Sequence, residues 1–237
     1  MEDLEPNNSD RFVSYTRLVG AIASVCAPGL APVAAEVVAN AIPNQRFDRV
    51  VRQMQQMQHE IDVLKHEKSV LEANLASQQG RALLEEGLVQ TANETDEEVR
   101  KFIGSLLARS MTEEELDYYR TQKILRILDE LIHPELIWLI YSATRSKKPL
   151  SPESADTKLP DKDEFERRHS NILKGDRYTL IGRQKEMDTD ALARSYKNKL
   201  LRLDLIAETK RGGEGYYQVT DLGYLVVRYI LSPLSGW

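Results

Sequence analysis

The stretch that decides the fold of the C-terminal part is DTDALARSYKNKLLRLDLIAETKRGGEGYYQVTDLGYLVVRYI, residues 188–230. Its first part predicts an amphipathic helix, because apolar residues recur at helical spacing, at Leu192, Tyr196, Leu200 and Leu203. A strand at 205–208, a glycine-rich tip at 212–215 and a second strand at 216–219 are expected to follow. A further amphipathic helix is expected at 221–230. The predicted order is therefore helix, two-stranded hairpin, helix.

Local chemistry explains both the hairpin and the last helix. Glycines in the tip supply positive φ without a Cβ clash. The Thr220 hydroxyl is placed to cap the helix that follows it. Gly223, in the first turn, lets that helix approach the hairpin closely. One apolar face is expected on this helix, formed by Leu222, Leu225, Val226, Tyr229 and Ile230.

Two runs in this stretch carry a family resemblance. They are Leu-x-x-Leu-x-Leu-Ile at 200–206 and Tyr-x-x-Thr-x-Leu-Gly at 217–223. With the helix–hairpin–helix order, they resemble the winged-helix domain of bacterial MarR-like regulators. The resemblance implies a winged-helix domain, which we place over 133–237. Residues 146–161 hold three prolines and no periodic apolar face, so they are expected to form an exposed polar loop or linker. Winged helices bind DNA or serve as protein-binding modules, so the fold leaves both functions open.

Six residues of this domain are candidates for nucleic-acid contact. Four are expected on the polar side of the candidate recognition helix and two at the hairpin, where phosphate contacts would be made: Arg194, Lys197, Asn198, Arg202, Lys210 and Arg211. Against this, residues 176–237 hold ten Lys/Arg and eight Asp/Glu, a net charge of only +2. Asp188, Asp190 and Asp204 also bracket the helix. Because DNA-binding modules concentrate positive charge on one face, we favour protein contacts.

A heptad pattern marks 44–80 as a coiled coil. Apolar residues alternate at steps of three and four over four heptads, which predicts a narrow seam that meets another helix. Lys68 occupies one core position of the pattern. The predicted oligomerisation residues are Phe47, Val50, Met54, Met57, Ile61, Leu64, Leu71 and Leu75. We expect the chain to associate with itself through this seam, and a partner helix inside the same chain is the alternative.

The N-terminal part contains an apolar segment, residues 18–42, that is long enough to span a bilayer. Pro28, Pro32 and Glu36 interrupt it, which favours an apolar helical hairpin within 1–43. We expect this hairpin to be buried in a soluble assembly and to contact membranes only conditionally. The preceding 1–17 carries four acids and two arginines, unlike a secretory signal. With one cysteine in the chain, a cytoplasmic location is expected.

A helical bundle is expected at 81–132. Thr95–Glu98 and Thr112–Glu115 match capping boxes, and His133-Pro134 matches a helix start. Much of 18–140 also resembles an uncharacterised bacterial type found near phage-defence systems. That resemblance rests on the apolar hairpin, the coiled coil, a Thr-x-Glu-Glu-x-Arg run at 95–100 and the RILDEL run at 126–131. It carries no catalytic motif.

The sequence gives little support to an enzyme. It holds no Gly-x-Gly-x-x-Gly, Walker A, His-Glu-x-x-His or Gly-x-Ser-x-Gly motif, and its four histidines are dispersed. We expect no catalytic, cofactor-binding or metal-binding residue. The predicted fold is mainly α, and the predicted function is that of a non-enzymatic oligomeric interaction or effector protein. A dimeric winged-helix DNA-binding regulator is the alternative.

Overall fold

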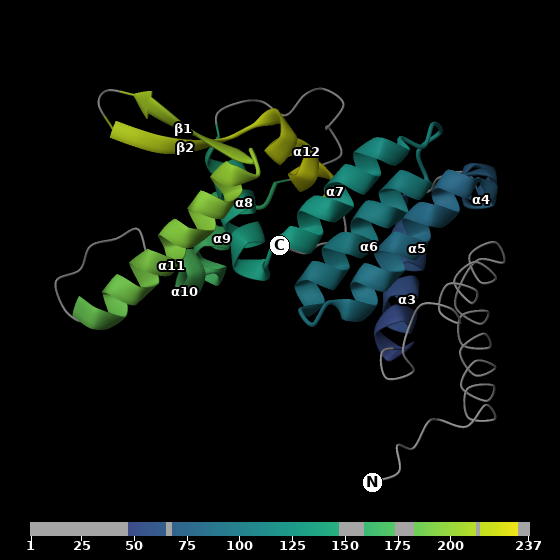
Figure 1. Cartoon of the computed structure of the whole chain (residues 1–237), viewed down its shortest axis with the longest axis horizontal. Helices are drawn as coiled ribbons and strands as arrows, with labels where there is room; N and C mark the ends of the chain where they lie inside the picture. The colour runs from purple at the N-terminus through teal and green to yellow at the C-terminus, as the bar shows by residue number, and fades with distance from the viewer. Residues whose placement is uncertain (1–46, 65–67, 147–158, 174–182, 212–213, 232–237) are drawn as a thin grey trace, which may run out of the picture. The chain divides into compact units, whose positions relative to one another are not determined.

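The computed structural model describes residues 47–64, 68–146, 159–173, 183–211 and 214–231 (Figure 1). Within these ranges the chain is mainly helical, with a two-stranded antiparallel sheet near the C-terminus, which confirms the predicted fold class at that level. The predicted apolar hairpin at 1–43 lies outside the described residues. The chain divides into two compact units, between Arg126 and Ile127, whereas the sequence predicts a domain boundary at 132/133.

The first unit is a helical bundle. α3 packs against α5 and α6, α4 packs against the same two helices, and α5 packs against α6. Gly87 allows the close approach of α5 and α6, because a Cβ there would lie 2.6 Å from Cδ1 of Leu107. The helices of this part are α3 (Phe47–Leu64), α4 (Lys68–Ala76), α5 (Gln78–Asn93), α6 (Glu97–Met111) and α7 (Tyr118–Glu130), the last of which crosses the division between the units.

Two predicted capping boxes are wrong in detail. The N-cap of α6 is Asp96 and not Thr95, since the Asp96 carboxylate accepts from the backbone N–H groups of Glu98 (2.8 Å) and Val99 (3.3 Å). Thr112 ends α6 instead of starting a helix, and its hydroxyl donates to the carbonyl of Ala108 at 2.9 Å. A carboxylate next to the first turn also complements the helix dipole, which favours Asp96 over its neighbour.

The second unit is arranged around α8 (His133–Arg145). Figure 1 shows α8 among the other elements of this unit, and it packs against α9, α10, α11, α12 and β2. The helix start predicted at His133-Pro134 is confirmed, and the Glu135 carboxylate accepts from the Ile132 N–H at 3.0 Å. The remaining elements are α9 (Lys162–Arg168), α10 (Ser170–Leu173), α11 (Arg183–Arg202), β1 (Ile206–Arg211), β2 (Glu214–Val219) and α12 (Asp221–Ile230).

The hairpin is longer than predicted. Its register runs from Ile206 opposite Val219 to Arg211 opposite Glu214, so residues 214 and 215 belong to β2 and not to the tip. The predicted cap of α12 is confirmed, because the Thr220 hydroxyl accepts from the Gly223 N–H at 3.0 Å. The close approach at Gly223 is confirmed as well, since a Cβ there would lie 2.1 Å from the Leu205 carbonyl oxygen.

Candidate interaction surface of helix α11

Helix α11 does not bury the face that its apolar residues predict. Leu200 is fully buried, but Leu192 is 54% exposed. The buried side is formed by Ala193, Lys197 and Leu200, which recur at steps of four and three. The amphipathic helix is therefore present, and its buried face is rotated from the predicted one by the inclusion of a lysine.

Lys197 is held among aromatic rings. Its side chain is only 8% exposed, and Nζ lies 4.3 Å from the Trp138 ring centroid and 5.4 Å from that of Tyr217. An ammonium within about 6 Å of a ring centroid is attracted to the π face, and the apolar stem of lysine packs well on such rings. The expectation that Lys197 lies on the polar side of the helix is wrong, because α8 and β2 bury it.

Trp138 belongs to a larger aromatic group on α8. The Tyr141 ring meets that of Trp138 edge to face, with centroids 5.9 Å apart. The Tyr141 hydroxyl donates to Oε2 of Glu166 at 3.2 Å, and the guanidinium of Arg145 lies 5.5 Å from the Tyr141 ring centroid. Burial raises the pKa of the Tyr141 phenol; Arg145 lowers it, and Glu166 raises it again. The phenol thus remains a neutral donor to Glu166 at physiological pH.

The outward side of α11 carries the remaining candidates. Arg194, Asn198 and Arg202 are exposed there. Nζ of Lys199 lies 3.4 Å from Oε2 of Glu130, and Nη2 of Arg202 lies 3.9 Å from the same oxygen. Part of the positive charge of α11 is thereby matched by a carboxylate of α7. Three of the four predicted contact residues of α11 therefore lie on one exposed side of the helix. The fourth, Lys197, is buried against α8 and β2 and is not available for such a contact.

The other two candidates, Lys210 and Arg211, are placed only by their backbone. They end β1, paired with Gly215 and Glu214 of β2. Their side chains lie outside what the structure describes, so their contact with phosphate stays a prediction.

The heptad seam is buried within the first unit. α3 packs against α5 and α6, and the seam side chains that the structure describes are all buried: Val50, Met54, Met57, Ile61, Leu71 and Leu75. The side chains of Phe47, Leu64 and Lys68 lie outside the described residues. A partner helix inside the same chain is thus present, and self-association through the seam stays a prediction.

Two polar side chains that join the helices of the first unit were not predicted. Nη1 of Arg49 donates to the carbonyls of Ala92 (3.2 Å) and Glu94 (2.9 Å), at the end of α5. Nδ2 of Asn74 donates to the carbonyls of Met111 and Glu113, both at 2.9 Å, at the end of α6. Both residues satisfy carbonyls that a helix end leaves unpaired. Apolar periodicity carries no signal for such contacts, which depend on tertiary placement.

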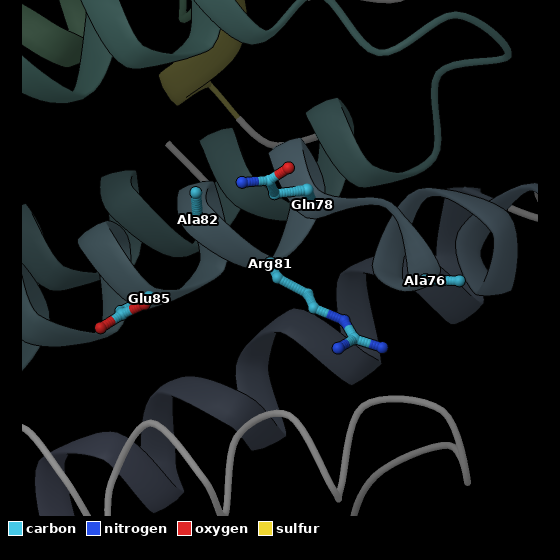
Figure 2. Close-up of a pocket in the computed structure, with 5 residues that line it drawn as sticks. All are labelled: Ala76, Gln78, Arg81, Ala82 and Glu85. Carbon is cyan, nitrogen blue, oxygen red and sulfur yellow. The ribbon is translucent and has the colours of Figure 1, made fainter.

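A shallow hollow lies at the junction of α4 and α5 (Figure 2). Its volume is about 420 Å³, and Figure 2 shows its lining residues, Ala76, Gln78, Arg81, Ala82 and Glu85. Nε of Arg81 donates to the Leu75 carbonyl at 3.3 Å, which ties α5 to the end of α4. The lining mixes both signs of charge with two alanines, and this composition favours no particular class of ligand.

Neither a metal-binding cluster nor a helix that could span a membrane is found within the described ranges. These ranges hold no group of three or more His, Cys, Asp or Glu side chains that could bind a metal ion. Among the helices with described residues, none combines the length and apolar character needed to cross a bilayer. The segment 18–42, for which conditional membrane contact is predicted, lies outside the described residues.

Comparison of the chain with protein families, with curated protein sequences and with solved structures finds no match. The resemblances to MarR-like regulators and to a type found near phage-defence systems therefore rest on the sequence patterns alone.

Proposed function

We propose that this chain is a non-enzymatic helical interaction protein that self-associates, and that its second unit is a winged-helix module used for protein contacts. The observation that carries the proposal is the placement of the α11 cations. Lys197 is buried under Trp138 and Tyr217, and Lys199 lies beside Glu130. A helix that read duplex DNA would present such cations to phosphates.

The order of elements in the second unit supports the winged-helix assignment. α8 is followed by the short helices α9 and α10, then by α11, the β1–β2 hairpin and α12. α11 and the hairpin both pack on α8, which leaves the outward sides of α11 and of the hairpin available for a partner. In helix–turn–helix proteins the corresponding second helix makes the contacts, so we assign partner recognition to α11.

The outward face of α11 suits contact with a protein. Leu192 is 54% exposed, and Ala191 and Ser195 are exposed beside it. Small side chains let a partner backbone approach, and covering an exposed leucine with a partner lowers the free energy. Acidic residues also flank the face, since Asp204 is exposed and Asp190 is half-buried. A phosphate backbone would be repelled by these carboxylates.

A DNA-binding regulator is the second candidate, because Arg194, Asn198 and Arg202 are exposed on the same outward side of α11. Arginine pairs with guanine and asparagine with adenine in the major groove, so these side chains are of the right kind for base contacts. Among the described side chains on this side of α11, two exposed arginines fall short of the roughly six to ten phosphate contacts of a strongly salt-dependent DNA-binding protein. We therefore expect weak binding without sequence preference.

Photo-crosslinking identifies the class of partner directly. A photoreactive amino acid is placed at Asn198, and a control probe is placed at Arg168 of α9, which is also exposed. After irradiation in the producing cells, the adducts are treated with nuclease, and their peptides are identified by mass spectrometry. Nuclease-resistant adducts that contain peptides crosslinked to the probe are expected at 198 and not at 168. Nuclease-sensitive adducts at 198 would contradict the proposal and favour the regulator.

A duplex-binding titration gives an independent result. Fluorescence anisotropy of labelled duplexes is followed at physiological salt with the full chain. We expect micromolar or weaker binding that Arg202→Ala changes little. Nanomolar binding to one palindromic duplex, lost in Arg194→Ala or Arg202→Ala, would establish the regulator instead.

A further inference from the structure

Helix α3 buries a single stripe of apolar side chains. The stripe consists of Val50, Met54, Met57 and Ile61, which are between 0% and 7% exposed. Two of its four members are methionines, although the whole chain has only five. Methionine is unbranched and polarizable, so it packs against differently shaped partners with little loss. A stripe of this composition is suited to exchange between two surfaces.

We call α3 docked when it packs against α5 and α6. In the docked helix, the buried Gln53 side chain costs free energy. The side chain is 2% exposed, and among the described residues its Nε2 amide has no hydrogen-bond partner. The amide lies against Gly104 of α6, where an added Cβ would come within 1.9 Å of Nε2. Burying a polar group without a partner costs the hydration it loses, so this residue weakens the packing of α3 on α6.

The heptad register removes this cost in a two-stranded coiled coil. With Met54 and Ile61 at a and Val50 and Met57 at d, Gln53 falls at a g position, at the edge of the seam. There its amide reaches water. Arg52, Gln55 and His59 take the outer b and f positions of the same register, and all three are already exposed. In a pair of α3 helices, this register thus places all four polar side chains where they can contact water.

Hydrogen bonds from polar side chains attach α3 to α5 and α6. The other helices of the unit also pack against one another. Arg49 donates to the carbonyls of Ala92 and Glu94, and Nε2 of Gln56 donates to the Lys101 carbonyl at 3.3 Å. α5 still packs against α6, and α4 against both, when α3 is left out of account. Asn74 keeps its two bonds to the end of α6. α4, α5 and α6 therefore contact one another independently of α3.

We propose that α3 is a releasable helix: it leaves α5 and α6, and its Val50–Ile61 stripe pairs with the α3 helix of a second copy of this chain. The inference rests on the proposed self-association and specifies its surface. A second copy is the occupant because a released stripe must be buried again, and the same stripe on another chain is self-complementary in the two-stranded register. Self-association and the release of α3 are then one equilibrium.

Two variants shift this equilibrium in opposite directions. Gln53→Met removes the buried amide at nearly the same shape and favours the docked helix. Arg49→Ala removes two hydrogen bonds of the docked helix and favours release. Each has a matched control at an exposed position of α3, Gln55→Met and Arg52→Ala. The full chain is studied by light scattering over a concentration series and by hydrogen exchange of amides 47–64.

The release equilibrium of each chain is expected to shift about tenfold, from the usual cost of an unpaired amide and the usual gain from two hydrogen bonds. Because two chains release α3 to form one dimer, the dimer dissociation constant is expected to shift about a hundredfold in each direction. Gln53→Met should raise the dimer dissociation constant and slow exchange in α3. Arg49→Ala should lower the dissociation constant and, at concentrations where the chain is monomeric, speed exchange in α3. Adding Met57→Lys to Arg49→Ala should abolish the dimer, while both controls should behave as the wild type.

Three results would overturn the release of α3. The first is fast exchange in Arg49→Ala with a monomeric mass at every concentration. The second is an equal change of mass in Gln53→Met and Gln55→Met. The third is a wild-type oligomer whose mass neither Arg49→Ala nor Gln53→Met alters, which leaves self-association standing and places it on another surface. A chain that stays monomeric in all variants contradicts the proposed self-association itself.

Discussion

Helices α3 and α11 both lie against the core of their own unit, but they do so by different means. α3 uses an uninterrupted stripe of apolar side chains, with Val50, Met54 and Met57 fully buried. α11 uses Ala193, Leu200 and a lysine whose ammonium lies over the rings of Trp138 and Tyr217. The α3 interface combines apolar area with hydrogen bonds from Arg49 and Gln56, and the α11 interface includes cation–π attraction from neighbouring elements.

This difference decides how each helix can change partners. An apolar stripe has no directional requirement, so α3 can exchange one apolar surface for another. Lys197 requires the rings of Trp138 and Tyr217 in defined places, so α11 is fixed to α8 and β2. We therefore assign movement to α3 and rigid presentation of a surface to α11.

The largest effect is expected when the stripe of α3 is truncated. Met57→Ala should lower the free energy of unfolding by about 2–5 kcal/mol, because a fully buried methionine loses its packing and leaves a cavity. Gln55→Ala, at an exposed position of the same helix, should change it by less than about 0.5 kcal/mol. Urea denaturation followed by circular dichroism measures both. Equal effects for the two variants would show that α3 contributes little to the stability of its unit.

The second prediction separates the stem of Lys197 from its charge. Lys197→Ala should cost about 1–3 kcal/mol, since it removes both the cation–π attraction and the apolar stem. Lys197→Met keeps a stem of similar length and should recover about half of that loss. Denaturation gives the free energies, and hydrogen exchange of β1 and β2 reports on the hairpin. A Lys197→Ala variant within about 0.5 kcal/mol of the wild type would mean that the rings do not hold α11.

The sequence was sufficient to predict the structural features that follow from apolar periodicity and local capping. The seam of α3, the start of α8 at His133-Pro134 and the cap that Thr220 gives α12 depend on residues close together in the chain. The close approach at Gly223 follows from its missing Cβ. These features follow from spacing, capping and the space left by a missing Cβ, which a sequence displays directly. The partner of the seam was left open, because periodicity gives the face of a helix but not what covers it.

The sequence was insufficient where long polar side chains decide the packing. Lys197 is buried because Trp138 and Tyr217, 59 and 20 positions away, come together around it. The same holds for Arg49 at the end of α5 and for Asn74 at the end of α6. Such residues look like solvent-facing charges or amides in a pattern of apolar positions. Only tertiary contacts show that their polar atoms are used inside the chain.

The third prediction concerns the start of α6, the helix on which α3 packs. Asp96→Ala should cost about 1 kcal/mol, because two backbone N–H groups lose their acceptor. Thr95→Ala should cost clearly less, since Asp96 and not Thr95 caps the helix. Thermal unfolding of the two variants side by side tests this. A larger loss of stability in Thr95→Ala than in Asp96→Ala would show that Thr95 caps the helix, as the sequence predicts.

The smallest effect is expected at the end of α11, where the chain turns into β1. Asp204 has a positive φ of 56°, a conformation that costs little only in glycine and is tolerated by aspartate. The turn is a Schellman motif, because the Leu205 N–H donates to the Leu200 carbonyl at 2.9 Å and the Asp204 N–H donates to that of Leu201 at 3.0 Å. Glycine is the preferred residue at this position of the motif.

Asp204→Gly should therefore raise the free energy of unfolding by up to about 1 kcal/mol. Relief of the strain at positive φ gains about 1–2 kcal/mol, and the entropy that glycine adds to the unfolded chain takes back about 0.5–1 kcal/mol. The Asp204 carbonyl, which accepts from the Thr220 hydroxyl, is a backbone group and is retained. Asp204→Ala is the control, because it removes the same carboxylate and keeps a Cβ at positive φ. It should destabilise the chain, and a gain of equal size in both variants would show that the carboxylate, and not the backbone conformation, limits the stability of this turn.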